Sequence, residues 1–215
     1  GLLERWLMLL GAPTFLERAA APLLRRIGDE WHAGRLTPAQ EHLATAAVER
    51  VVAGTLSPLA VPPDAPTVIV TTPAGERHQS GALLAAAAAA TTGWHVIFLG
   101  ADLPAESIAE AAVATGAEAV GLSLVFAENR MRAVSELREL RRLLAPHVRM
   151  LVGGGAASAL RSDLEPGDAA VYLTSLVQGL AIRWSLGARS FPLPDEGMRL
   201  LDTLLVLMRP PTVED

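Results

Sequence analysis

The sequence predicts an α/β protein, in which an N-terminal helical bundle is followed by a doubly wound parallel sheet of the Rossmann or flavodoxin type. After residue 66, short aliphatic runs alternate with segments of helical periodicity, which is the chain order of a parallel sheet with helical crossovers. Before residue 57, apolar residues recur at helical spacing. Residues 56–66 contain four prolines and an aspartate and read as a linker. We therefore divide the chain into a helical module (1–57), a linker (58–66), an α/β module (67–187) and a C-terminal tail with a helix (188–215).

The helical module is expected to form three helical segments. The first covers residues 2–10. Pro22 should bend the second segment or mark a boundary in it, because proline has no N–H to donate, and Gly34 closes it. Thr37 is a good N-cap for the third segment, which ends at Gly54. One apolar face of the second segment is formed by Leu16, Ala20, Leu23, Leu24, Ile27 and Trp31.

In the α/β module, five strands are expected near residues 67–71, 94–99, 119–124, 148–152 and 169–173. The helices between and after them are expected near residues 78–92, 104–115, 129–145, 156–160 and 174–186. The alanine run at 85–90 predicts a helix packed close against the sheet, since alanine allows a close approach. In the tail, an apolar helix is expected over about 196–208, and no chemistry is assigned to it.

Three polar or small-residue elements follow three of the predicted strands, where open α/β sheets place their ligands. The first is Glu76-Arg77-His78-Gln79-Ser80-Gly81. The second, Ser123-Leu124-Val125, begins after 41 further residues, and the third, Gly153-Gly154-Gly155, after another 27. A lone histidine at a helix start is more often a cap or a surface residue, so His78 by itself would be weak evidence. Together, the three elements resemble the cobalamin-binding domains, whose pattern is acidic-x-His-x-x-Gly, then Ser-x-Leu/Val, then Gly-Gly.

This resemblance implies cobalamin as the cofactor and His78 as the lower cobalt ligand, for which a neutral imidazole is suitable. The nucleotide tail of the cofactor would lie in a slot formed by Ser123, Gly153, Gly154 and Gly155, with Ser123 bonded to the base. Arg77, Gly81 and Val125 are also expected among the cofactor-binding residues. Metal-bound histidines usually donate their other N–H to an acceptor. Glu76 or a backbone carbonyl is expected in that role.

A second constellation lies in the helical module, where Trp31 and His32 are followed by Glu41 and His42. Taken alone, these residues read as a core tryptophan, two surface histidines and a capping glutamate. With Gly75-Glu76-Arg77-His78 downstream, however, they resemble the CarH/LitR family of light-sensing regulators, the cobalamin-binding region of MerR-family transcription factors.

In that family a four-helix bundle covers the upper face of the corrin. The resemblance implies that Trp31 packs against an adenosyl group, that Glu41 hydrogen-bonds to it and that His42 lies near the same cavity. His32 becomes a candidate upper cobalt ligand after light has removed the adenosyl group. Adenosylcobalamin is the expected form, and methylcobalamin is the other possibility. The resemblance also implies a homo-oligomer, tetrameric in the dark, and DNA binding through a winged-helix domain that is absent from this chain.

Composition excludes several other classes. The net charge of −5 and pI of about 5.6 argue against electrostatic binding of nucleic acid by this chain itself. No apolar run approaches the ~18 residues of a membrane span, no leader peptide is visible, and there is no cysteine. A cytoplasmic protein is expected.

Two alternatives remain beside the sensor. One is a corrinoid protein that carries methylcobalamin for methyltransferases, and the other is an ordinary α/β enzyme or binding module without a corrinoid. Trp31 and Glu41 argue against the carrier, which must leave the upper face open to partner enzymes. The lack of a nucleophile–base pair, a P-loop and a Gly-x-Gly-x-x-Gly turn argues against an enzyme.

Overall fold

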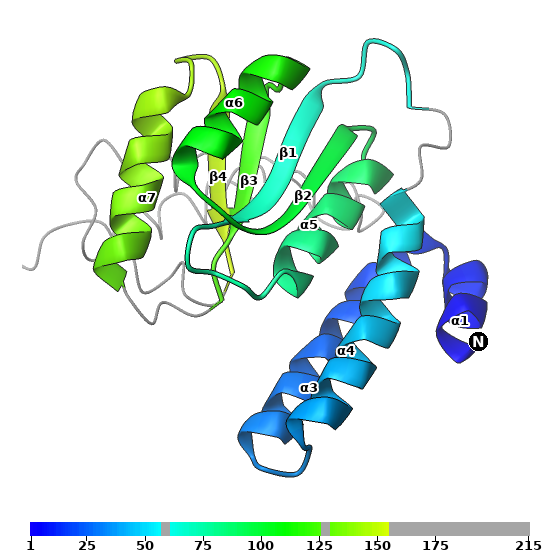
Figure 1. Ribbon diagram of the computed structural model, residues 1–215. Helices are drawn as coiled ribbons and strands as arrows, with labels where there is room; N and C mark the ends of the chain where they lie inside the picture. The colour runs from blue at the N-terminus through cyan, green and yellow to red at the C-terminus, as the bar shows by residue number, and fades with distance from the viewer. Residues whose placement is uncertain (57–60, 126–129, 155–215) are drawn as a thin grey trace, which may run out of the picture.

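The computed structural model describes residues 1–56, 61–125 and 130–154, and every structural statement below refers to these ranges. The predicted strand at 169–173, the helices at 156–160, 174–186 and 196–208, and Gly155 lie outside them. Figure 1 shows a sheet with helices on both faces and a hairpin of two long helices beside it. No helix among the described residues is both long and apolar enough to cross a membrane.

In the part of the chain that the structure describes, four parallel strands form one sheet in the order β2-β1-β3-β4. They are β1 (Thr67–Pro73), β2 (His95–Leu103), β3 (Ala119–Ser123) and β4 (Arg149–Gly153). The chain leaves β1 toward β2 on one side and returns to β3 on the other, so the strand order reverses between β1 and β3. This is the flavodoxin-type order, and the reversal point is where such sheets bind ligands. The predicted fold class is confirmed.

The strand β2 is longer than predicted at its carboxyl end. Two register shifts in the β1–β2 pair allow pairing to continue past the point where the sequence indicates a turn. Thr71 pairs with Gly100 and Pro73 pairs with Leu103 across these irregularities. In a sequence, Gly100 and Pro73 both indicate the end of a strand, which is why the extension was not predicted. In the structure Gly100 has a positive φ and still pairs with Thr71.

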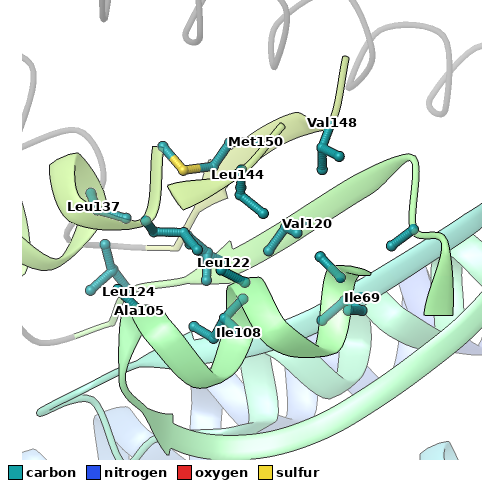
Figure 2. Packing of buried hydrophobic residues seen from close by; sticks show 14 of the residues in the cluster. Ile69, Ala105, Ile108, Val120, Leu122, Leu124, Leu137, Leu144, Val148 and Met150 are labelled. Atoms are coloured by element: carbon teal, nitrogen blue, oxygen red, sulfur yellow. The ribbon is translucent and has the colours of Figure 1, made fainter. Parts of the chain in front are cut away.

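Helices cover both faces of the sheet, as expected for doubly wound topology. On one face lies α5 (Ser80–Thr91), and on the other lie α6 (Ala105–Thr115) and α7 (Arg130–Leu143). Successive residues of β1 alternate between the faces. Val68 and Val70 belong to the cluster with α5, whereas Ile69 belongs to the cluster on the other face, which includes Ile108 of α6 and Leu137 of α7 (Figure 2).

The alanine-rich helix α5 is buried on two sides. Ala82 and Ala86 belong to the apolar cluster against the sheet, whereas Leu83 and Ala87 belong to a second cluster with the helical module. That second cluster includes Phe15, which is fully buried. Small side chains let α5 approach both neighbours closely, which confirms the interpretation of the alanine run.

The helical module contains three helical runs. The helix α1 (Leu2–Leu10) is followed by a continuous run made of α2 (Ala12–Phe15), a π-helical stretch η1 (Leu16–Ala20) and α3 (Ala21–His32). The third run is α4 (Pro38–Ala53), after which comes the short 3-10 turn η2 (Gly54–Leu56). The boundary expected at Pro22 is present, because the π-helical stretch ends just before it, and π turns accommodate a local break in the hydrogen-bond ladder.

Two details of the α3–α4 hairpin bear on the sequence predictions. Thr37 caps α4 as expected, since its Oγ1 accepts a hydrogen bond from Gln40 N at 3.3 Å. Trp31, however, is 39% exposed. Its place on the apolar face of the second segment therefore does not make it a core residue. The tip of the hairpin extends beyond the helices that it packs on (Figure 1). Among the described residues, few side chains therefore cover the last turn of α3.

Candidate functional site

His78 lies in the loop between β1 and α5. The sequence placed it at the start of a helix over 78–92, and this boundary is wrong, because α5 begins at Ser80. The reason is the side chain of Glu76, which folds back over the loop. Its Oε1 accepts hydrogen bonds from the backbone N–H of His78 at 2.8 Å and from His78 Nδ1 at 2.7 Å. The loop is thus closed locally, and helix geometry starts only after it.

The carboxylate of Glu76 joins the two strands on either side of the switch point. The residue is only 2% exposed, and its second oxygen, Oε2, accepts a hydrogen bond from Val125 N at 2.8 Å. A buried carboxylate is costly unless it is hydrogen-bonded, and here both oxygens have donors. Glu76 therefore fixes the His78 loop against the segment that follows β3. Of the two acceptors expected for His78, the side chain of Glu76 is the one present.

The geometry of His78 suits a metal ligand. Because Nδ1 donates to a carboxylate, the neutral ring carries its lone pair on Nε2. The side chain is 55% exposed although its partner is buried. An oriented imidazole with a fixed tautomer is the usual arrangement of a metal-binding histidine and its carboxylate. The donor chemistry therefore fits a cobalt ligand.

The carboxyl end of β2 also holds the loop that contains His78. Asp102 has a φ of 62°, the left-handed region. Its Oδ1 accepts a hydrogen bond from Gly75 N at 2.7 Å, and its own N–H donates to Thr72 Oγ1 at 2.9 Å. Arg77 Nε lies 3.7 Å from Asp102 Oδ2, an exposed ion pair.

Sequence reasoning missed Asp102. The available signal was an aspartate two residues after a glycine, near the carboxyl end of a strand, because aspartate tolerates positive φ better than most residues. Arg77, which the family pattern singled out, lies beside it and pairs with it.

The glycines of the predicted tail slot have different structural roles. A Cβ on Gly81 would lie 2.5 Å from Ser123 Oγ and 3.8 Å from the Val125 side chain. A Cβ on Gly154, where φ is +100°, would overlap the backbone of Leu124. Packing inside the protein therefore requires glycine at Gly154, whereas a larger residue at Gly81 would need the Ser123 hydroxyl to move. The slot argument did not anticipate either contact.

Gly153 differs from these two glycines. It is exposed at the end of β4, and among the described residues nothing lies within 4 Å of its ideal Cβ position. Its position leaves room for a ligand to approach the backbone. Ser123, at the end of β3, is buried and faces Gly81.

The second constellation gathers at the tip of the α3–α4 hairpin. Trp31 and His32 end α3, and their rings meet edge to face with centroids 4.7 Å apart. Glu41 and His42 lie in the first turns of α4, and His42 Nδ1 is 2.8 Å from Glu41 Oε2. In Figure 1 the hairpin tip and the carboxyl ends of the strands point toward the same lower side of the view.

Both hairpin histidines have a defined tautomer. His32 Nδ1 donates to the carbonyl of Gly28 and His42 Nδ1 donates to the carbonyl of Pro38, each at 2.8 Å. In a neutral ring the lone pair is therefore on Nε2, the atom that would bind a metal. Glu41 also accepts a hydrogen bond from Thr45 Oγ1 at 2.8 Å, which holds its carboxylate along α4.

A sheet with a carboxylate-oriented histidine at its switch point and an aromatic helical hairpin beside it defines the class of corrinoid-binding proteins. Models of the B12 binding domain match residues 2–53 and 66–175, one in each module. This chain belongs to the B12-binding domain family, and its cofactor is cobalamin.

Two curated relatives are HTH-type transcriptional repressors of Myxococcus xanthus. CarA is 32% identical over 161 residues, which are 75% of this chain and 54% of that protein. CarH is 32% identical over 149 residues, which are 69% of this chain and 50% of that protein. The chain thus spans about half the length of these relatives. The resemblance to cobalamin-binding domains of such regulators is confirmed.

Among solved structures, the monomethylamine corrinoid protein of Methanosarcina barkeri is similar with a TM-score of 0.59. The match covers 81% of this chain and 88% of that protein at 17% identity. This likeness supports the fold.

Proposed function

We propose that this chain is the light-sensing, adenosylcobalamin-binding region of a transcriptional regulator. The observation that carries the proposal is the hairpin tip, where Trp31 and Glu41 occur together in a chain that is 32% identical to two transcriptional repressors. DNA contacts would be made by sequence outside these 215 residues, since the repressors are about twice as long as the matched part. Such a regulator has to reach DNA, so a cytoplasmic location belongs to the proposal, and enzymatic activity does not.

In this function His78 would hold the cofactor through the metal, and the hairpin residues Trp31 and Glu41 would hold the group that the metal carries. When bound, the cofactor supplies a cobalt–carbon bond that visible light breaks. The indole of Trp31 offers a large apolar plane for an adenine or ribose ring. The carboxylate of Glu41 accepts hydrogen bonds from ribose hydroxyls, which are donors. His42, paired with Glu41, helps to orient that carboxylate.

His32 would stabilise the light state. It adjoins Trp31 at the exposed end of α3, so a shift of the hairpin that follows loss of the adenosyl group would carry its imidazole toward the upper face. Binding there would hold the shifted conformer, as any ligand favours the conformer that it binds more tightly.

A second candidate function is a corrinoid protein that presents methylcobalamin to methyltransferases. The observation in its favour is the similar fold of the Methanosarcina barkeri monomethylamine corrinoid protein. The two functions differ in the upper face, because a carrier must expose it to partner enzymes.

The test is an absorption spectrum of the protein reconstituted with adenosylcobalamin, recorded before and after green light, for wild type and His78→Ala. We expect a histidine-ligated, base-off spectrum in the dark, a stable spectral change after light, and loss of the ligation features with weaker binding in His78→Ala. His95→Ala, an exposed histidine at the start of β2, is the matched control and should resemble wild type. A wild-type spectrum that light leaves unchanged would favour the carrier.

A further inference from the structure

Glu49 belongs to α4 in the helical module, yet its carboxylate contacts residues that follow His78. Oε1 accepts a hydrogen bond from Ser80 Oγ at 2.7 Å, and Oε2 accepts one from Gln79 Nε2 at 3.2 Å. These partners are 31 and 30 residues away along the chain, respectively. The two bonds therefore join the helical module to the α/β module at the point where α5 begins.

The start of α5 favours a nearby negative charge, although the two bonds of Glu49 come from side-chain donors. The first N–H groups of a helix have no acceptor within the helix, and the positive end of the helix dipole favours a nearby negative charge. Gln79, the N-cap, makes no side-chain capping hydrogen bond within the described part of the chain, and no acidic residue lies in the first turn. Glu49 brings a carboxylate to this end from the other module.

Glu49 is also the polar edge of an otherwise apolar contact. Its neighbours on α4, Val48 and Val52, are buried in the cluster that includes Leu83 and Ala87 of α5. Apolar contacts are non-directional, so small sliding movements cost them little. Hydrogen bonds depend on distance and angle. The two bonds of Glu49 therefore fix how far α4 lies along α5.

We propose that Glu49 is a positioning residue that couples the seating of the helical module to the orientation of His78. The backbone of His78 lies between two carboxylates, since Glu76 holds its N–H and ring from one side and Glu49 holds the next two residues from the other. A displacement of α4 would pull Gln79 and Ser80 and so turn the imidazole. A movement of the helical module would in this way change the orientation of His78. The inference rests on the proposed ligand role of His78, and it does not require a light response.

The first experiment uses the protein without cofactor. Hydrogen exchange of the amides in residues 79–83 should be about threefold to tenfold faster in Glu49→Ala than in wild type, which corresponds to the loss of about one hydrogen bond. Glu49→Gln keeps the volume and one acceptor oxygen and should fall between them. Glu139→Ala, which removes an exposed carboxylate on α7, is the control and should leave these amides unchanged. Unchanged exchange in Glu49→Ala would overturn the coupling at its first step.

The second experiment measures dissociation of methylcobalamin in the dark, in wild type and in His78→Ala, each with and without Glu49→Ala. If Glu49 acts through His78, its removal should speed dissociation about threefold to tenfold when His78 is present. In the His78→Ala background the same change should have less than about a twofold effect. Equal effects in both backgrounds would show that Glu49 only stabilises the interface, and would overturn the proposal.

Ser80→Ala gives the same comparison if Glu49→Ala does not fold, because it removes one of the two bonds and leaves the carboxylate in place. The two hypotheses fail separately. A dark spectrum that is unaffected by His78→Ala contradicts the ligand assignment, whereas a dark spectrum that is affected, with no dependence on Glu49, contradicts only the coupling.

Discussion

At the scale of single residues, the site depends on a few side chains that bond across loops. Glu76 is an example, because one buried carboxylate accepts from His78 and from Val125 and so connects the loops after β1 and β3. Asp102, near the end of β2, likewise bonds to Thr72 near the end of β1 and to Gly75 in the loop after it. The position of His78 is therefore set by residues at the ends of three strands. We predict that substitutions of Asp102 change the affinity for cobalamin.

Three substitutions at Asp102 separate its backbone conformation from its side-chain bond. Asp102→Asn keeps positive φ and an acceptor for Gly75 N, and should change the free energy of unfolding by less than about 1 kcal/mol. Asp102→Gly keeps the conformation but loses the acceptor. Asp102→Ala loses both and should be destabilised by about 1–3 kcal/mol. Urea unfolding and cobalamin affinity are the measurements, and an Ala variant as stable as the Asn variant would contradict this account.

At the scale of elements, strand ends and helix ends carry the site, and their glycines are not equivalent. Gly153 and Gly154 are neighbours after the same strand, β4, but only Gly154 has positive φ and a backbone neighbour where its Cβ would be. The two adjacent glycines therefore have different roles. Packing against Leu124 requires glycine at Gly154, whereas Gly153 leaves space in which a ligand can approach the backbone.

The pair Gly153→Ala and Gly154→Ala should separate these constraints. Gly154→Ala should lower the free energy of unfolding by about 1–3 kcal/mol, because its φ is unfavourable for alanine and its Cβ would overlap Leu124. Gly153→Ala should stay within about 0.5 kcal/mol of wild type and yet bind cobalamin more weakly if the tail passes there. Thermal unfolding and cobalamin titration give the two readouts. Loss of stability in both variants alike would refute the distinction.

The α3–α4 hairpin is the element that should select the upper group of the cofactor. Trp31→Ala should reduce the preference for adenosylcobalamin over methylcobalamin about threefold to tenfold, the size of an aromatic stacking contribution. Glu41→Gln should act in the same direction. Trp6→Ala is the matched control, because Trp6 on α1 has a similar exposure of 42% against 39% for Trp31. If Trp31→Ala and Glu41→Gln both keep the preference, the methyl carrier gains support.

At the scale of the whole molecule, α5 is shared between the two modules. One of its sides packs on the sheet and another packs on the cluster around Phe15, while its first residues bond to Glu49. A movement of the helical module therefore acts on the same helix that follows the His78 loop. We propose that such a movement changes how the chain assembles with other copies, as the resemblance to the light-sensing regulators implies.

The proposed assembly change gives a prediction for the whole protein. Wild type with adenosylcobalamin should elute from size-exclusion chromatography as a tetramer in the dark and as a smaller species after green light. His32→Ala should lose the stable light-state spectrum, since it removes the imidazole proposed for the upper face. Retention of that spectrum in His32→Ala would assign the role to another group, with His42 tested next. A wild-type mass that is the same in dark and light would contradict the switch.

The sequence by itself was enough to determine the fold class and the order of the elements, because both follow from periodicity, which is a local property of the chain. It also located His78, Ser123 and the two described glycines of the Gly153-Gly154-Gly155 run at strand ends. The strand boundaries of β3 and β4 agree with the prediction to within one residue. The capping of α4 by Thr37 was likewise predictable, since it involves residues three apart.

Tertiary structure decided what depends on residues far apart in the chain. His78 lies outside α5 because Glu76 is held by Val125, 49 residues away. The extension of β2 and the role of Asp102 arise from pairing with β1. The requirement for glycine at 154 and the close approach of Gly81 to Ser123 arise from contacts with β3 and the segment after it. Trp31 fits the apolar periodicity of its helix and is nevertheless exposed, because burial depends on whether another element covers that turn, and among the described residues little does.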